Sequence, residues 1–179
     1  MKTYNPITQS RFLLVNLLVW AFLSLAFKNG DKIPDFEAKN QDGKTIKLSQ
    51  FLGKPVILFF YPKDDTPGCT KEACNFRDKY SVLQKHDAIV LGVSTQGENS
   101  HQEFRKKYRL PFDLLVDRDG SVAKKMQISS YPLVGYHKRR TLLIDRTGHL
   151  FKYYESVDPA EHVFQLIEDL KVIEEKKGF

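Results

Sequence analysis

Short apolar runs alternate along the chain with stretches in which apolar residues recur at helical spacing. Residues 56–61 (VILFFY), 88–94 (AIVLGVS) and 141–144 (TLLI) are runs of this kind. They are rich in β-branched and aromatic residues, which predicts buried strands. Residues 150–154 follow the third run across a tight turn, so we expect these two segments to form a hairpin.

Helical spacing occurs twice in the middle of the chain. Residues 69–86 place Phe76, Tyr80 and Leu83 at positions i, i+4 and i+7, which predicts one long helix between the first two strands. Residues 100–108 have the same kind of spacing and predict a second, shorter helix.

The start of a last helix is indicated near the C-terminus. Asp158 suits the N-cap, Pro159 the first helical position, and Glu161 the third position of a capping box. The resulting order is strand, helix, strand, helix, hairpin and helix. It predicts an α/β protein with a central mixed β-sheet flanked by helices. This order suits a thioredoxin-like fold, although a fold does not establish a function.

The first 29 residues differ from the rest of the chain. They contain three basic residues and no acidic residue, and residues 12–27 carry no charge. As a helix these sixteen residues would span about 24 Å, which is less than the ~30 Å hydrocarbon core of a membrane. The basic start, the leucine-rich centre and the small residues before Phe27 fit a secretory signal peptide cleaved after Ala26. The alternatives are an uncleaved membrane anchor and a start codon assigned too early, with the protein beginning near Gly30.

We therefore divide the chain into a leader, residues 1–29, and one folded domain, residues 30–179. If the leader is used, we expect the protein in the cell envelope or periplasm, with possible membrane association through the leader. Otherwise the protein is cytoplasmic.

The net charge of +6 and the pI near 9.2 invite a nucleic-acid or membrane partner. Half of that charge belongs to the leader, and the remainder is too small for a polyanion-binding surface, so we expect no nucleic-acid partner. Residues 137–140 (HKRR) are interpreted as the solvated edge of a strand. We also expect His86, His101 and His162 on helix surfaces, and Phe59 to Tyr61 in the core.

The chemistry of the chain centres on one of its two cysteines. Thr66 as N-cap and Pro67 at the first position place Cys69 in the first turn of a helix, after a buried strand. Unpaired N–H groups and the positive end of the helix dipole favour the thiolate there. Gly68 allows a small substrate to approach the backbone closely. The alternative is a small buried cysteine without a catalytic role, because free cysteine is often buried.

Cys74 follows Cys69 by five residues. In a regular helix their Cα atoms would lie about 8.6 Å apart, which exceeds the roughly 7 Å limit for a disulfide. A bond between them therefore requires the first turns of the helix to unwind, which suits a transient bond better than a permanent one. The spacing differs from the C-x-x-C pattern of thioredoxin-like redox motifs.

The motif Pro62-x-x-x-Thr66-x-x-Cys69 resembles the active-site motif of peroxiredoxins. Residues 66–74 (TPGCTKEAC) are similar to the bacterioferritin comigratory protein or peroxiredoxin Q group of that family. The resemblance covers nearly all of residues 30–175, and further matching stretches are 100–104 (SHQEF), 110–115 (LPFDLL) and 139–145 (RRTLLID).

The resemblance implies a role for each residue of the motif. Cys69 would be the peroxidatic cysteine and Cys74 the resolving one, and the two would form a transient disulfide. Thr66 would hydrogen-bond the peroxide, with Gly68 beside it at the substrate, and Pro62 would shield the site from water.

The resemblance also implies an arginine beside the thiolate. The first Arg of an Arg-x-Thr pattern is Arg139, with Thr141 two residues later. Arg140 is the fallback, because alternation along a strand should point it away from Arg139.

The implied function is that of a thiol-specific peroxidase with a peroxiredoxin domain of thioredoxin-like fold. It would reduce hydrogen peroxide and organic hydroperoxides, and a thioredoxin-like dithiol would re-reduce the disulfide. The resemblance implies no flavin, haem or metal, and we expect a monomer. The alternatives are a thiol–disulfide oxidoreductase acting on protein substrates and a binding module without enzymatic activity.

Overall fold

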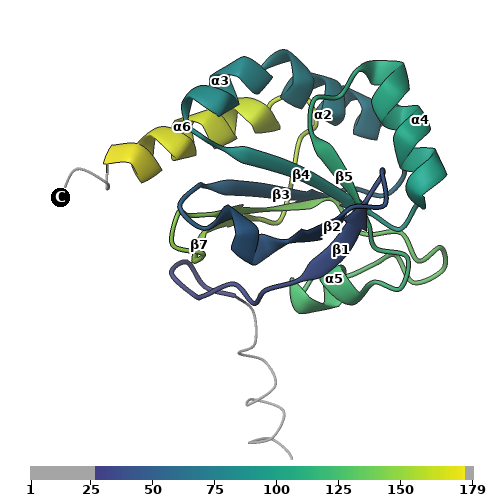
Figure 1. The fold of residues 1–179 in the computed structure, drawn as a ribbon, viewed down its shortest axis with the longest axis horizontal. Coiled ribbons are helices and arrows are strands. Elements are labelled where there is room, and N and C mark those ends of the chain that lie inside the picture. The colour runs from purple at the N-terminus through teal and green to yellow at the C-terminus, as the bar shows by residue number, and fades with distance from the viewer. Residues whose placement is uncertain (1–26, 176–179) are drawn as a thin grey trace, which may run out of the picture.

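The run VILFF forms the middle of a seven-stranded mixed sheet in the computed structural model, which describes residues 27–175 (Figure 1). The strands are β1 (Glu37–Asn40), β2 (Thr45–Lys47), β3 (Val56–Phe60), β4 (Ile89–Ser94), β5 (Asp113–Val116), β6 (Arg140–Ile144) and β7 (Leu150–Tyr154). Their order across the sheet is β2-β1-β5-β4-β3-β6-β7. The pairs β3–β4 and β4–β5 are parallel, and the remaining pairs are antiparallel. The predicted mixed sheet and the predicted β6–β7 hairpin are confirmed.

Alternation along β3 divides the core into two parts. Ile57 and Phe59 contribute to one cluster of buried side chains, and Leu58 and Phe60 contribute to the other. Successive side chains of a strand point to opposite faces, so a strand covered on both faces is apolar throughout. Phe59, Phe60 and Tyr61 lie in the core, as predicted.

Helices cover both faces of the sheet. They are α2 (Pro67–Asp78), α3 (Tyr80–Lys85), α4 (Glu98–Tyr108), α5 (Ser121–Lys125) and α6 (His162–Glu175), with a short 3₁₀ turn η1 at Leu48–Phe51. Figure 1 shows α2, α3, α4 and α6 on one face and α5 on the other. The predicted helix at 100–108 is confirmed as α4.

The single helix predicted over 69–86 is wrong, because the structure contains α2 and α3 with a break at Lys79. Lys79 has φ −102° and ψ 7°, in the sparsely populated bridge region. Tyr80, directly after the break, packs beside Phe112 with ring centroids 6.2 Å apart. The apolar residues keep their helical spacing across the single non-helical residue, so the spacing alone could not reveal the break.

The predicted start of the last helix is confirmed in part. Asp158 accepts the Ala160 N–H with its carboxylate, at 2.8 Å, and the His162 N–H with its carbonyl, at 3.0 Å, as an N-cap does. Regular α6 nevertheless begins only at His162. The carbonyls of Pro159 and Ala160 accept hydrogen bonds from the Asn75 side chain, at 2.8 and 3.0 Å. The Asn75 side chain thus donates to two carbonyls that would accept backbone N–H groups if the helix began at Pro159.

Strands β1, β2 and β5 and helix α5 were not predicted. The leader prediction for residues 1–26 lies outside the described residues. Phe27 lies within the described residues and packs against the core cluster that contains Leu58 and Phe60. Its backbone N–H donates to the Gln127 side chain at 3.0 Å. Within residues 27–175, no helix has both the length and the apolar character needed to span a membrane.

Candidate active site

Cys69 lies in the first turn of α2, directly beyond the loop that follows β3. Parallel α/β sheets place their sites at the carboxyl ends of strands, and β3 is parallel to β4. Thr66 is the N-cap with extended backbone, at φ −94° and ψ 151°, and Pro67 takes the first helical position, as predicted. The Cys69 side chain is buried, with 2% of its surface exposed.

One guanidinium contacts both Cys69 and a buried acid. Arg139 Nη2 lies 3.2 Å from Cys69 Sγ, and Arg139 Nη1 forms an ion pair with Glu72 Oε2. Glu72 is one turn after Cys69 on α2 and is 1% exposed. Burial raises the pKa of Glu72 to about 7, although Arg139 opposes this shift. Burial by itself lowers the pKa of Arg139, but Glu72 and Cys69 outweigh it and keep the guanidinium charged.

The structure distinguishes the two adjacent arginines. Arg139 reaches Cys69, whereas Arg140 donates to the Arg139 carbonyl at 2.8 Å. Gly68 lies beside the guanidinium, and a Cβ built on Gly68 would make an ordinary van der Waals contact with Arg139 Nη2, at 3.4 Å.

The Thr66 hydroxyl does not cap the helix. It donates to the Lys63 carbonyl at 3.1 Å, so its lone pairs stay free to accept a hydrogen bond from a substrate. The Thr66 carbonyl accepts the Thr70 N–H at 2.8 Å and begins the helical ladder. Pro62, half-buried, lies in the same loop directly after Tyr61.

Cys69 and Cys74 are both free thiols on the continuous helix α2. Cys74 is half-buried, and burial raises the pKa of its thiol, while the nearby Arg77 guanidinium opposes the shift. Because both residues lie in regular helix, the distance argument from helix geometry applies. A bond between them requires α2 to open.

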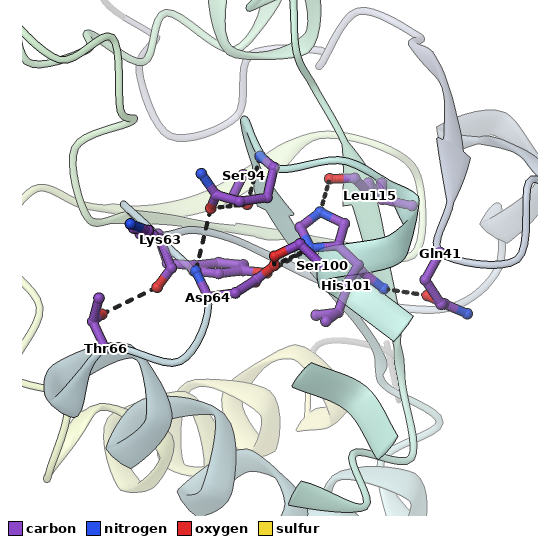
Figure 2. Close-up of polar contacts among 11 residues, drawn as sticks. Gln41, Lys63, Asp64, Thr66, Ser94, Ser100, His101 and Leu115 are labelled. Carbon is purple, nitrogen blue, oxygen red and sulfur yellow. Dashed lines mark hydrogen bonds and ion pairs between the residues drawn. The ribbon is translucent and has the colours of Figure 1, made fainter. Parts of the chain in front are cut away.

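A buried polar network under the active-site loop was missed by the sequence reasoning (Figure 2). The Asp64 carboxylate accepts hydrogen bonds from the Tyr61 and Ser100 hydroxyls, both at 2.7 Å. His101 Nδ1 lies 2.8 Å from Asp64 Oδ2, and the His101 side chain is fully buried. The prediction that His101 lies on a helix surface is wrong. The sequence contains no signal that a buried acid faces this side of the helix.

Other predictions for histidines also need correction. His162 is 1% exposed, and its Nε2 lies 2.8 Å from Thr141 Oγ1. Burial lowers the pKa of His162 to about 4, so the ring is neutral near neutral pH. His86 is half-buried, with Nδ1 2.9 Å from Glu174. His137, placed at a solvated edge by the sequence, is fully buried and lies 2.9 Å from Asp117.

The part of the chain that the structure describes contains no group of three or more His, Cys, Asp or Glu side chains able to hold a metal ion.

Comparison with known families matches residues 29–152 to the model of the AhpC/TSA family. The chain belongs to the AhpC/TSA family. Peroxiredoxin Bcp of Bacillus subtilis is 40% identical over 153 residues, which cover 82% of this chain and 97% of that protein. Chloroplastic peroxiredoxin Q of Triticum aestivum is 44% identical over 146 residues, covering 81% of this chain and 66% of the wheat protein, slightly less than two thirds of its length.

Solved structures of peroxiredoxins have the same fold. Peroxidoxin BcpB of Mycobacterium tuberculosis superposes with a TM-score of 0.77 at 34% identity, covering 82% of this chain and 98% of that one. A PrxQ mutant of Xylella fastidiosa gives a TM-score of 0.76 at 27% identity, covering 82% and 96%. The thioredoxin-like peroxiredoxin fold and the peroxiredoxin Q and Bcp resemblance are thus confirmed. These relatives support a thiol peroxidase and do not favour the protein thiol–disulfide oxidoreductase.

Proposed function

We propose that the protein is a peroxiredoxin that reduces hydrogen peroxide and organic hydroperoxides through Cys69. The observation that supports this most directly is the guanidinium of Arg139 at 3.2 Å from Cys69 Sγ, at the start of a helix. A charge that does not titrate and a helix N-terminus both favour the thiolate, which is the nucleophile in peroxide reduction.

In the first step the Cys69 thiolate attacks one peroxide oxygen. An S–O bond forms as the O–O bond breaks, the sulfur is oxidised to sulfenic acid, and the other oxygen leaves as hydroxide or alkoxide, which takes up a proton. Arg139 faces the reacting sulfur and stabilises the developing negative charge. The Thr66 hydroxyl accepts a hydrogen bond from the peroxide and so aligns the O–O bond for attack.

In the second step α2 opens and Cys74 attacks the sulfenic acid. The Cys74 thiolate forms the S–S bond and the sulfenic oxygen leaves as hydroxide, which becomes water on protonation. A thioredoxin-like dithiol then reduces the transient disulfide by exchange and is itself oxidised. Pro62 limits the access of water to the first step.

Peroxide consumption by the full chain with a thioredoxin-type reductant tests this function. Wild-type protein should turn over, Cys69→Ser should be inactive, and Cys74→Ser should complete one turnover and then stop. Peroxide reduction that persists in Cys69→Ser would exclude the mechanism. If Thr66 and Arg139 variants reduce insulin disulfides normally and the wild type consumes no peroxide, the alternative oxidoreductase is correct.

The proposal includes a monomeric protein that uses its leader to reach the cell envelope or periplasm. The acid-free basic start and the uncharged segment 12–27 support the leader. Mass spectrometry of the mature N-terminus should find Phe27 first if the signal peptide is cleaved, whereas Met1 would indicate an anchor. Sedimentation of the purified chain tests the monomer. In the envelope, the reductant would be a membrane-delivered or periplasmic dithiol.

A further inference from the structure

Helix α4 holds the active-site loop from two sides. Asp64 points inward to Ser100 and His101, while Asp65 contacts Lys107 and Tyr108 at 2.6 and 2.5 Å. All four partners belong to α4, Glu98–Tyr108. The loop that carries Thr66 is thereby fixed to a helix that contributes no residue to the proposed chemistry.

His101 is the most buried member of this network, and both of its ring nitrogens face acceptors. Nδ1 lies 2.8 Å from Asp64 Oδ2, and Nε2 lies 3.2 Å from the Leu115 carbonyl oxygen (Figure 2). A carbonyl only accepts, so Nε2 must carry a proton. The contact between Nδ1 and Asp64 needs a second proton, which resides either on the ring or on the carboxyl group.

The other partners of Asp64 decide between these two arrangements. Its carboxyl group also accepts from the Tyr61 and Ser100 hydroxyls, both at 2.7 Å. Burial and the neighbouring Asp64 raise the pKa of Tyr61 well above its ordinary value, so this hydroxyl remains a donor. Hydrogen bonds donated to a carboxylate stabilise its charged form. With these two donors in place, the carboxyl group can accept a further hydrogen bond from the ring, which is the arrangement with the second proton on Nδ1.

We propose that His101 is a buried imidazolium that acts as the positioning residue of the active-site loop, through its ion pair with Asp64. This proposal rests on the proposed peroxidase function. His101 holds Asp64 in place, and the peptide before Asp64 carries the Lys63 carbonyl that accepts the Thr66 hydroxyl at 3.1 Å. Loss of the hydrogen bond from Nδ1 to Asp64 lets the loop shift, which misaligns Thr66 relative to the sulfur. Small misplacements of an aligning group cost up to about 10²-fold in rate.

Two substitutions of His101 distinguish the contributions of the hydrogen bonds made by Nδ1 and by Nε2. The amide of Asn can replace the Nδ1 donor toward Asp64, and the longer amide of Gln can replace the Nε2 donor toward Leu115. We expect His101→Gln to lower the second-order rate constant for hydrogen peroxide by roughly 10- to 100-fold, and His101→Asn to lower it clearly less. Glu103→Gln, an exposed change on the same helix, is the matched control and should resemble the wild type.

A second reagent distinguishes positioning from general disruption. Iodoacetamide alkylates the Cys69 thiolate without needing Thr66 to align an O–O bond, so its rate in both variants should stay near the wild-type value. If the rate constants for peroxide and for iodoacetamide fall equally, the proposal is overturned. It is also overturned if His101→Gln keeps full peroxide activity, or if its activity falls no further than that of His101→Asn. If the wild type reduces no peroxide, the proposed function itself fails.

Spectroscopy of the wild-type chain keeps the proposal testable if neither variant folds. In a ¹H–¹⁵N spectrum of the histidine side chains, assigned through the backbone, His101 should show a proton on each ring nitrogen near neutral pH. If the spectrum shows a neutral ring with a proton on only one nitrogen, the proposal that His101 is an imidazolium is overturned, whatever the activity measurements show.

Discussion

The segments on the two sides of Cys69 are held in different ways. The loop before it is fixed by directional polar contacts, with Asp64 in a buried network and Asp65 in an ion pair on the surface. The rest of helix α2 is held by the buried side chains of Ala73 and Phe76 and by three polar links. These links are Glu72 to Arg139, Asn75 to the carbonyls just before α6, and Arg77 to the Tyr108 carbonyl. In the proposed cycle the loop must keep its geometry while the helix must open, and the two kinds of attachment match these requirements.

The largest effect should come from Arg139, which contacts both the Cys69 thiol and the Glu72 carboxylate. Arg139→Ala removes the guanidinium beside Cys69 Sγ, so the rate constant for peroxide should fall by roughly 10²- to 10³-fold in stopped-flow measurements. Arg140→Ala is the matched control, because Arg140 contacts the Arg139 carbonyl instead of the sulfur. A comparable loss in Arg140→Ala would show that the fallback arginine is the functional one.

The Glu72 link should make the stability of the protein depend on pH. The pKa of Glu72 is raised from an ordinary 4.5 to about 7, so the folded state binds more protons than the unfolded state between these values. The stability of the wild type relative to Glu72→Gln should therefore fall as pH rises from about 4.5 to about 7 and stay level above that. Urea unfolding across this range measures the difference. A constant difference would contradict the raised pKa.

The Asn75 link should control how readily α2 opens. Asn75→Ala removes hydrogen bonds of 2.8 and 3.0 Å to the Pro159 and Ala160 carbonyls, at a cost of about 1 kcal/mol to the closed helix. Disulfide formation after the first step should become roughly fivefold faster, since 1.4 kcal/mol corresponds to about tenfold in an equilibrium. Overoxidation of Cys69 to sulfinic acid should decrease accordingly, as mass spectrometry can measure.

Asn99→Ala, an exposed change on α4, is the control for the Asn75 experiment. It should leave both the rate of disulfide formation and the extent of overoxidation unchanged. If Asn75→Ala behaves like this control, the closed state of α2 depends on its apolar contacts alone.

The smallest effect should come from the surface contact of the loop. Asp65→Asn removes the charge that pairs with Lys107, and because both side chains are about half exposed, solvent screens the pair and the loss of stability should be small. Asp65 has a φ of 56°, which Asn tolerates better than Ala, so Asp65→Ala should be the more destabilised of the two in urea unfolding. Equal stabilities would show that the backbone at Asp65 carries no strain.

Local patterns predicted most of the central elements of the fold. The runs that became β3, β4 and β6 are largely apolar because the sheet buries them. Strand β7 was predicted from the turn that joins it to β6, which is encoded by neighbouring residues. The break at Lys79 and the late start of α6 could not be predicted in this way. Both involve contacts with distant residues, the first with Phe112 and the second with Asn75.

The sequence alone determined the position of Cys69 at a helix start, the spacing to Cys74 that forbids a disulfide in regular helix, and the family motif around them. These features are local, because capping residues and helix geometry act over a few positions. Only the tertiary structure brought Arg139 to the thiol and buried His101 against Asp64, across 70 and 37 positions of the chain. Such contacts are set by the packing of the sheet and helices. The Arg-x-Thr pattern indicated Arg139 only through the family resemblance, and no pattern indicated the burial of His101.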